Sequence, residues 1–275
     1  MIISCLRKSM KPKIIVTAIG LLAILVGSAM GQSPEHEYLG LKDELHVYLL
    51  IGQSNMAGRA TYGDGESGPI EGGYLLNGLD EWEAARVPLN RYSTIRKRLE
   101  MQRLNPGYAF AQAMLESSDG ASIGLVVNAK GGTKIEQWEK GTEFYAEAVR
   151  RTKAAAVTGT LKGILWHQGE GNSREPEAYP EKLAKLIEDL RQDLGAPHLP
   201  FIAGQVHYHT ENKPHTKRLN ELLAQFPESV PYTACVKSES LATFDHTHFG
   251  TEAMIELGRR YAASIRLVQR RLPVD

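Results

Sequence analysis

The segment at residues 46–59, HVYLLIGQSNMAGR, carries the side chain with the clearest capacity for chemistry. Its apolar run, residues 47–51, stops abruptly at Gly52, and Ser54 follows two positions later. A buried strand that ends in glycine and small polar residues delivers a reactive side chain to the carboxyl edge of an α/β sheet. A serine hydroxyl at that place becomes a nucleophile for acyl transfer when a neighbouring base accepts its proton. The segment therefore predicts Ser54 as a nucleophile.

Three further polar clusters contain the residue types that such a nucleophile needs. They are Gly131-Gly132-Thr133, His167-Gln168-Gly169-Glu170 and Asp245-His246-Thr247-His248. The first two follow predicted strands, and the carboxyl ends of parallel strands meet at one edge of a sheet. The third lies in the loop before the last predicted helix, and we expect the fold to bring it to the same edge.

A base for Ser54 is predicted at His248. Asp245 lies three residues earlier, and in a tight loop its carboxylate reaches Nδ1 of the imidazole. That contact selects the tautomer in which Nε2 faces the serine, and it stabilises the imidazolium. His246 is adjacent to Asp245 and poorly placed for the same contact, so we interpret it as a loop residue. The predicted catalytic residues are therefore Ser54, His248 and Asp245.

Donors for an oxyanion are predicted in the backbone beside the nucleophile. The N–H of Ser54 stands at the start of a predicted helix, where the helix dipole favours negative charge. A second N–H comes from Gly131 or Gly132, because no side chain blocks a close approach there, and we favour Gly132. Gln53 and Asn55 flank the nucleophile and are predicted to tie its loop to neighbouring turns.

The elements that must position these residues alternate between strand and helix along the chain. Strands are predicted at residues 47–51, 122–128, 163–166, 201–206 and 232–236, and helices at 107–115, 144–155, 177–194 and 251–268. This alternation indicates an α/β fold with a parallel sheet of mostly five strands and helices on both faces. Residues 60–105 have weak periodicity, and we interpret them as a long loop that walls the substrate pocket.

The composition limits other functions. The 275 residues carry 32 basic and 32 acidic side chains, so no net charge attracts nucleic acid or an anionic surface. Cys5 lies in the leader and Cys235 stands alone in the rest of the chain, which excludes a disulfide in the mature protein and a cysteine-based zinc site. No cofactor is expected, and the sequence indicates no oligomeric state.

Residues 1–31 have the features of a secretory signal peptide. Basic residues precede an apolar run at residues 14–26, which is too short to span a membrane comfortably. Ala29-Met30-Gly31 supplies the small residues that a signal peptidase needs, so cleavage is expected before Gln32. The alternative is an uncleaved N-terminal anchor. Either way we expect a secreted or periplasmic protein whose catalytic domain covers residues 40–272, with no membrane contact unless the leader is retained.

Four motifs together resemble the SGNH hydrolases, in particular the branch of sialate O-acetylesterases and acetyl-xylan-esterase-like enzymes. They are GQSNMAG (52–58), GGT followed by Trp138, LWHQGEGN (165–172) and DHTH before a helix (245–248). The resemblance covers nearly all of residues 46–265. It implies a three-layer flavodoxin-like fold and a serine esterase that removes O-acetyl groups from carbohydrate, such as acetylated sialic acid or xylan.

Within this resemblance the third motif carries Gln168, where most members of the superfamily have asparagine. A glutamine amide donates hydrogen bonds as an asparagine amide does. Gln168 is therefore predicted as the third oxyanion donor, with Asn172 nearby as an alternative. We interpret Glu170 as an acceptor for backbone donors rather than as an acid catalyst.

Two alternative functions remain open. His207-Tyr208-His209 and Asp245-His246-Thr247-His248 contain His-x-His spacings, with His215 between them, and two such pairs suit zinc when they lie at strand ends. A metal-dependent hydrolase is therefore the first alternative, although the serine constellation predicts a site without metal. A non-catalytic glycan-binding module that uses the same pocket is the second.

Overall fold

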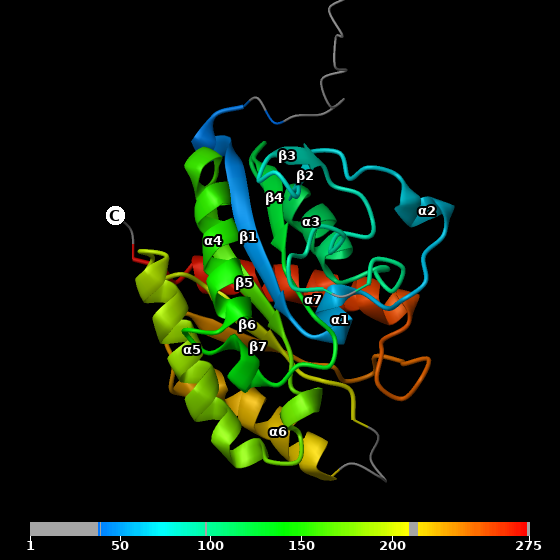
Figure 1. Cartoon of the computed structure of the whole chain (residues 1–275), viewed down its shortest axis with the longest axis vertical. Helices are drawn as coiled ribbons and strands as arrows, with labels where there is room; N and C mark the ends of the chain where they lie inside the picture. The colour runs from blue at the N-terminus through cyan, green and yellow to red at the C-terminus, as the bar shows by residue number, and fades with distance from the viewer. Residues whose placement is uncertain (1–37, 39, 97, 209–213, 274–275) are drawn as a thin grey trace, which may run out of the picture. The chain divides into compact units, whose positions relative to one another are not determined.

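The computed structural model describes residue 38 and residues 40–96, 98–208 and 214–273. Within these residues the chain forms a seven-stranded sheet in the order β3-β2-β4-β1-β5-β6-β7 (Figure 1). Neighbouring strands pair in parallel except β2 and β3, which pair antiparallel at one edge. The strands are β1 (Leu45–Gly52), β2 (Gly73–Leu76), β3 (Trp82–Ala84), β4 (Ser122–Val127), β5 (Thr160–His167), β6 (Phe201–Gly204) and β7 (Thr233–Val236).

Helices cover both faces of this sheet (Figure 1). Residues of α3 and α7 share one hydrophobic core with the sheet, and residues of α4, α5 and α6 share the other. The helices are α1 (Ser54–Ala57), α2 (Asp64–Ser67), α3 (Gly107–Leu115), α4 (Glu143–Thr158), α5 (Tyr179–Asp193), α6 (Pro214–Gln225) and α7 (Thr251–Gln269). The result is the three-layer arrangement that the alternation of strands and helices predicts.

The central strand β1 is buried on both sides. Successive side chains of a strand point to opposite faces, and Tyr48 and Leu50 join the core beneath α3 and α7. The alternate residues Val47, Leu49 and Ile51 join the core beneath α4 and α5. Because parallel strands covered on both faces consist of continuous apolar runs, this burial explains the unbroken apolar run at residues 47–51.

The structure confirms the α/β class, the parallel order and the five predicted strands, and it corrects the number of strands to seven. β2 and β3 lie within residues 60–105, the segment interpreted as one long loop. They have only four and three residues, which is too short for a strand period to stand out in the sequence. Helix α6 has no counterpart among the predicted elements. The predicted signal peptide lies outside the described residues.

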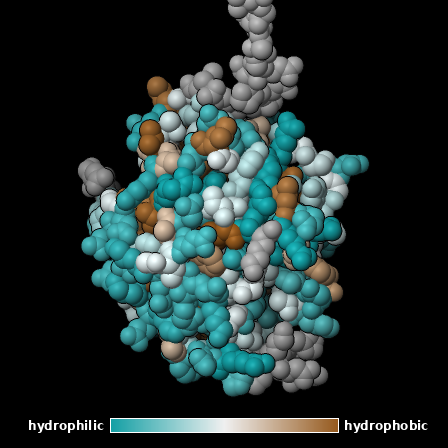
Figure 2. Space-filling model, in the orientation of Figure 1, coloured by the Kyte–Doolittle hydropathy of each residue, from teal (hydrophilic) through white to brown (hydrophobic). Residues whose placement is uncertain are grey.

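The helices of the described residues do not meet the requirements of a membrane span. None of their helices has both the length and the apolar character that crossing a bilayer requires. On the face shown in Figure 2, hydrophobic residues are scattered in small groups among hydrophilic ones. Exposed apolar side chains of this scattered kind, such as Leu79, are ordinary on protein surfaces.

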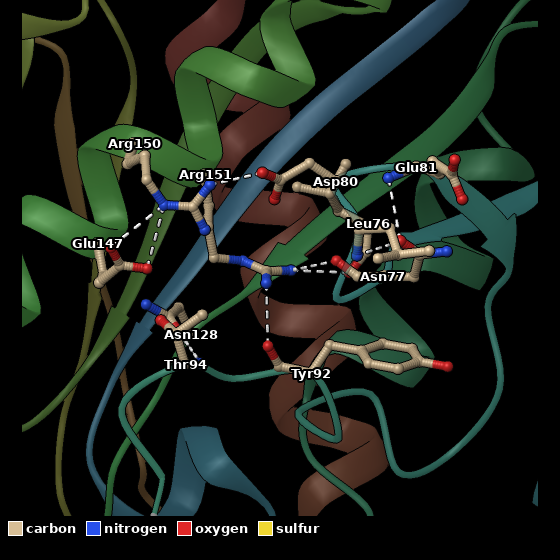
Figure 3. Close-up of polar contacts among 11 residues, drawn as sticks. Leu76, Asn77, Asp80, Glu81, Tyr92, Thr94, Asn128, Glu147, Arg150 and Arg151 are labelled. Carbon is tan, nitrogen blue, oxygen red and sulfur yellow. Dashed lines mark hydrogen bonds and ion pairs between the residues drawn. The ribbon is translucent and has the colours of Figure 1, made fainter.

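A buried arginine of α4 anchors the segment that leads from β2 toward the pocket (Figure 3). Arg151 is fully buried. Its Nη2 donates to the carbonyl oxygens of Leu76 (2.8 Å) and Asn77 (3.4 Å), and its Nη1 donates to the carbonyl of Tyr92 (2.9 Å). Burial lowers the pKa of this guanidinium below its ordinary value. The three bonds connect α4 to both ends of the segment that contains β3.

Replacing Arg151 by Met is expected to lower the free energy of unfolding by about 2–4 kcal/mol, because buried carbonyl groups lose their donors. The matched control is the neighbouring Arg150→Met. Arg150 pairs with Asp80 and Glu147 at the surface, and exposed pairs contribute less than about 1 kcal/mol. Urea denaturation of both variants measures the difference, and equal losses would contradict the anchoring role of Arg151.

Candidate active site

The nucleophile is presented by a sharp turn at the end of β1. Gly52 has φ 135°, and a Cβ at this position would lie 2.2 Å from the carbonyl oxygen of His167 in β5. Only glycine permits this approach. The N–H of Gln53 donates to that same carbonyl at 2.8 Å, and the chain then enters α1 at Ser54. Figure 1 shows α1 directly after the end of β1, and Ser54, the first residue of α1, therefore stands at the carboxyl end of a central strand.

The three predicted catalytic side chains lie together in hydrogen-bonded order. His248 Nε2 is 2.8 Å from Ser54 Oγ, and His248 Nδ1 is 2.6 Å from Asp245 Oδ2. His246 adopts a left-handed φ of 64°, which turns the backbone so that Asp245 and His248 face each other. His246 itself is an exposed loop residue, as the sequence interpretation expects.

The carboxylate of Asp245 accepts hydrogen bonds from the backbone as well as from the imidazole of His248. Its Oδ1 accepts from the backbone N–H groups of His248 (2.7 Å) and Thr247 (3.1 Å). Partial burial raises the pKa of Asp245, but the hydrogen bonds from the His248 ring and from the two N–H groups outweigh that effect. The net pKa is below the ordinary value. Asp245 is therefore an ionised acceptor for His248 Nδ1–H at neutral pH.

Asn55 connects the nucleophile turn to the loop that carries the base. Its side chain is fully buried. Nδ2 donates to Glu170 Oε1 (2.9 Å) and to the carbonyl of Thr247 (3.2 Å), while Oδ1 accepts from the N–H of Phe249 (3.1 Å). The two loop contacts lie on either side of His248. Asn55 thus ties its loop to a neighbouring turn, as predicted, and Glu170 accepts a hydrogen bond from this side chain.

Two of the predicted backbone donors belong to glycines with different surroundings. A Cβ on Gly131 would lie 3.4 Å from Ser54 Cβ, so this glycine packs against the nucleophile, whereas a Cβ on Gly132 would meet nothing within 4 Å. Gly132 has a left-handed φ of 73°. Among the described residues, the N–H groups of Ser54, Gly131 and Gly132 donate to no acceptor. All three remain available to a ligand.

Gln168 is not placed as predicted. Its Nε2 is 2.9 Å from the carbonyl of Thr133, 2.9 Å from Asn172 Oδ1 and 3.2 Å from Gln53 Oε1. Its Oε1 accepts from the hydroxyl of Tyr179. The side chain is fully buried and does not line the pocket. The structure therefore corrects the assignment of Gln168 as an oxyanion donor, because its amide is already committed to the protein.

The alternative donor, Asn172, is also committed. Its Nδ2 donates to both carboxylate oxygens of Glu136, and its Oδ1 accepts from the N–H of Ile135 and from Gln168.

The amide of Gln53 differs from these two amides. Its Oε1 accepts from Gln168 and from the N–H of Gly171, but its Nε2 donates to no described residue. Because Gln53 lines the pocket, the amide donor beside the nucleophile is that of Gln53.

A pocket of about 620 Å³ opens over Ser54 and His248. As expected, the segment 60–105 forms part of its wall, through Arg96, Arg98, Met101 and Gln102. The sequence interpretation did not single out these residues or the other two cations of the wall, Arg59 and Lys130. The only signal was a concentration of arginines in residues 91–103. The remaining lining residues are Gln53, Gly131, Gly132, Thr133, Gln137 and Thr247.

The histidines of the metal alternative lie in different surroundings where the structure describes them. His207 packs its ring against Phe249, with centroids 6.2 Å apart, and His215 is exposed on α6. His209 lies outside the described residues. No group of three or more His, Cys, Asp or Glu side chains suited to a metal ion occurs in the described part of the chain.

A three-layer fold with a serine, a histidine and an aspartate in hydrogen-bonded order at the carboxyl edge of its sheet is the arrangement of SGNH-type esterases. The family model for carbohydrate esterase, sialic acid-specific acetylesterase, matches residues 44–266. The chain belongs to this carbohydrate esterase family.

Relatives in sequence and structure agree with this assignment. A probable carbohydrate esterase of Arabidopsis thaliana is 32% identical over 233 residues, with 77% of this chain and 86% of that protein covered. An X-ray structure of an Arabidopsis thaliana protein has a TM-score of 0.73 at 29% identity and covers 83% of this chain and 99% of its own. A carbohydrate acetylesterase from Xanthomonas citri has a TM-score of 0.62 at 22% identity, covering 83% and 57% respectively, which shows likeness of fold alone.

Proposed function

We propose that this esterase removes O-acetyl groups from carbohydrate through an acetyl-serine intermediate. The observation that carries the proposal is the unbroken series of hydrogen bonds from Ser54 Oγ through His248 to Asp245. A free serine hydroxyl is a weak nucleophile at neutral pH and needs this arrangement to react. The carbohydrate esterase family supports ester cleavage, and acetylated sialic acid and acetylated xylan are both within the proposed range.

The proposed reaction has two acyl-transfer steps. Ser54 Oγ attacks the acetyl carbonyl carbon while its proton passes to Nε2 of His248. The tetrahedral intermediate then collapses, the bond to the sugar oxygen breaks, and His248 returns the proton to that oxygen. Water, deprotonated by the same nitrogen, attacks the carbonyl carbon of the acetyl-serine ester. The bond to Ser54 Oγ breaks, His248 returns the proton to that oxygen, and acetate leaves. Asp245 keeps Nδ1 protonated and stabilises the imidazolium in both steps.

The negative charge on the carbonyl oxygen is proposed to rest on three donors. Two are backbone N–H groups, from Ser54 and from the Gly131–Gly132 turn, which donate to no described residue. The third is Nε2 of Gln53, oriented by the bonds that its own Oε1 accepts from Gln168 and Gly171. Donors already held in place stabilise a developing oxyanion without reorganisation at the moment of reaction.

Gln53→Ala is accordingly expected to lower kcat about 10²- to 10³-fold, the usual effect of losing one oxyanion donor, with a smaller change in KM. Gln53→Glu is the informative companion, since it keeps an acceptor oxygen for Gln168 and Gly171 but removes the NH₂ donor. Steady-state kinetics on p-nitrophenyl acetate measures both. Wild-type kcat in the folded Gln53→Glu variant would rule out the donor role.

The proposed function is tested by acetate release from a panel of acetylated glycans, together with labelling by a fluorophosphonate probe. An acetyl-serine mechanism predicts acetate release and one probe adduct, located at Ser54 by peptide mass spectrometry. A non-catalytic glycan-binding module would bind the glycans but release no acetate and take no probe. Activity that EDTA abolishes and zinc restores would instead favour a metal-dependent hydrolase.

A further inference from the structure

Arg59 is held beside the nucleophile by the backbone. Its Nη1 donates to the carbonyl oxygens of Gly58 (2.7 Å) and Met101 (3.2 Å). Its Nη2 lies against Gly131, since a Cβ on that glycine would be 2.6 Å from Nη2 and 3.4 Å from Ser54 Cβ. The guanidinium and the nucleophile therefore flank the same glycine at the floor of the pocket.

The charge of Arg59 is not neutralised by a described residue. No carboxylate of the described residues lies within ion-pair distance of it, and burial lowers its pKa below the ordinary value. The buried Arg151 and Arg191 each donate to three carbonyl oxygens. Arg59 donates to two, both from Nη1, so Nη2 has donor capacity that the described residues leave unused.

The rest of the pocket wall has the same sign. Arg96, Arg98 and Lys130 also line it, and no Asp or Glu is among the described lining residues. Arg96 donates its Nε to a backbone carbonyl, Lys130 lies over an aromatic ring, and Arg98 approaches the exposed Glu100 only at 4.0 Å. A cleft lined by one sign of charge concentrates ligands of the opposite sign.

From this arrangement we infer that the acetylated sugar taken by this site carries a carboxylate, and that Arg59 binds it beside the ester. The inference rests on the proposed function and narrows its substrate. A guanidinium matches a carboxylate with paired N–H donors, and Arg59, whose Nη2 donates to no described residue, lines the cavity in which the sugar must lie. Two sugar classes supply this chemistry, the uronic acids and the nine-carbon acidic sugars of the sialic acid type.

The test compares pairs of substrates that differ at the carboxylate, which one member of each pair has and the other lacks. In one arm, acetylated methyl glucuronoside is compared with acetylated methyl glucoside. In the other arm, O-acetylated N-acetylneuraminic acid is compared with its methyl ester. The wild-type enzyme is expected to have a kcat/KM about 10- to 100-fold higher for the carboxylate of at least one pair, the effect of one charge-assisted interaction. The pair with the larger ratio identifies the sugar class.

Arg59→Gln is expected to remove most of that preference, and Arg59→Lys is expected to keep part of it because a point charge remains. Arg259→Gln is the matched control. Arg259 is exposed on α7 and outside the pocket lining, so the same change in net charge there is expected to leave both rates unaltered. Thermal unfolding verifies that each variant is folded. If Arg59→Gln does not fold, Arg96→Gln tests the same cationic wall.

The outcomes separate the two levels of the proposal. No preference for the carboxylate in either arm overturns the inference and leaves the esterase proposal standing. The inference is also overturned if Arg59→Gln loses equal activity on charged and neutral substrates. That result would indicate that Arg59 contacts the acetyl group, which both substrates share. Absence of acetate release from every substrate overturns the proposed function itself. A preference that falls with added salt, as exposed charge interactions do, supports the inference.

Discussion

Ser54→Ala is expected to lower kcat for acetate release about 10⁴- to 10⁶-fold, the loss seen when a serine hydrolase loses its nucleophile. The reason is chemical, because the only hydroxyl within hydrogen-bond distance of His248 Nε2 among the described residues is that of Ser54. The fold is expected to survive. Alanine fits the buried site, and the one lost hydrogen bond is worth about 1 kcal/mol.

Acetate release and thermal unfolding measure the two effects separately. Ser93→Ala is the matched control, since Ser93 has the same exposed fraction as Ser54, 6%, but donates to the carbonyl of Ala129 instead. His248→Ala is expected to be as inactive as Ser54→Ala, and the double variant no worse than either, because residues that act as a unit have non-additive effects. Near-wild-type activity of folded Ser54→Ala would refute the mechanism.

The proposed catalytic residues could be predicted from the sequence because part of their geometry is local. A strand that stops at Gly52 presents Ser54 within two residues, and Asp245 reaches His248 inside one turn. The partner of Ser54, by contrast, lies 194 residues away. The strand-edge rule places Ser54, but His248 lies in a loop before the last helix, and its approach to that edge was an expectation about the fold.

The choice between two glutamines could not be made in the same way. Gly52 is paired with His167 in the register of β1 and β5, so Gln53 and Gln168 both follow paired positions at the same edge. Which amide faces the pocket depends on contacts remote in sequence, above all the Tyr179 hydroxyl and the Thr133 carbonyl that hold Gln168. A pattern of residue types along the chain does not specify such contacts, so Gln168 was predicted as the donor, whereas the amide that lines the pocket is that of Gln53.

The basic residues of the pocket wall were not predicted from the sequence for a similar reason. Arg96 and Arg98 lie in a segment without periodicity, where a basic residue is as compatible with solvent as with a pocket. Arg59 follows the nucleophile motif closely, but its contact with Gly131 depends on the fold. In a chain without net charge, basic side chains indicate a function only when the structure shows that several of them line one cavity.

Asp245→Asn is expected to lower kcat about 10³- to 10⁴-fold with little change in KM, although the substitution changes a single atom type. The oxygen that accepts from the N–H groups of His248 and Thr247 is needed to hold the loop, so the new NH₂ group must face His248 Nδ1. That nitrogen then has to be an acceptor, which places the ring proton on Nε2. In this tautomer His248 cannot accept the proton of Ser54, and the imidazolium loses its counter-charge.

The neighbouring variant His246→Asn tests whether disturbance of the loop alone has this effect, because asparagine tolerates the left-handed φ of 64° found there. We expect it to keep wild-type kcat.

The wild-type pH profile adds a second check. The pKa of Asp245 is below its ordinary value, so Asp245 is protonated only at pH below that ordinary value. Asparagine imitates this protonated carboxyl group. A loss of kcat in weakly acidic solution must therefore arise from another group. Asp245→Asn should therefore lower kcat throughout the neutral pH range, and the pH at which kcat falls in weakly acidic solution should stay the same. An unchanged kcat would show that His248 does not depend on Asp245 for its tautomer.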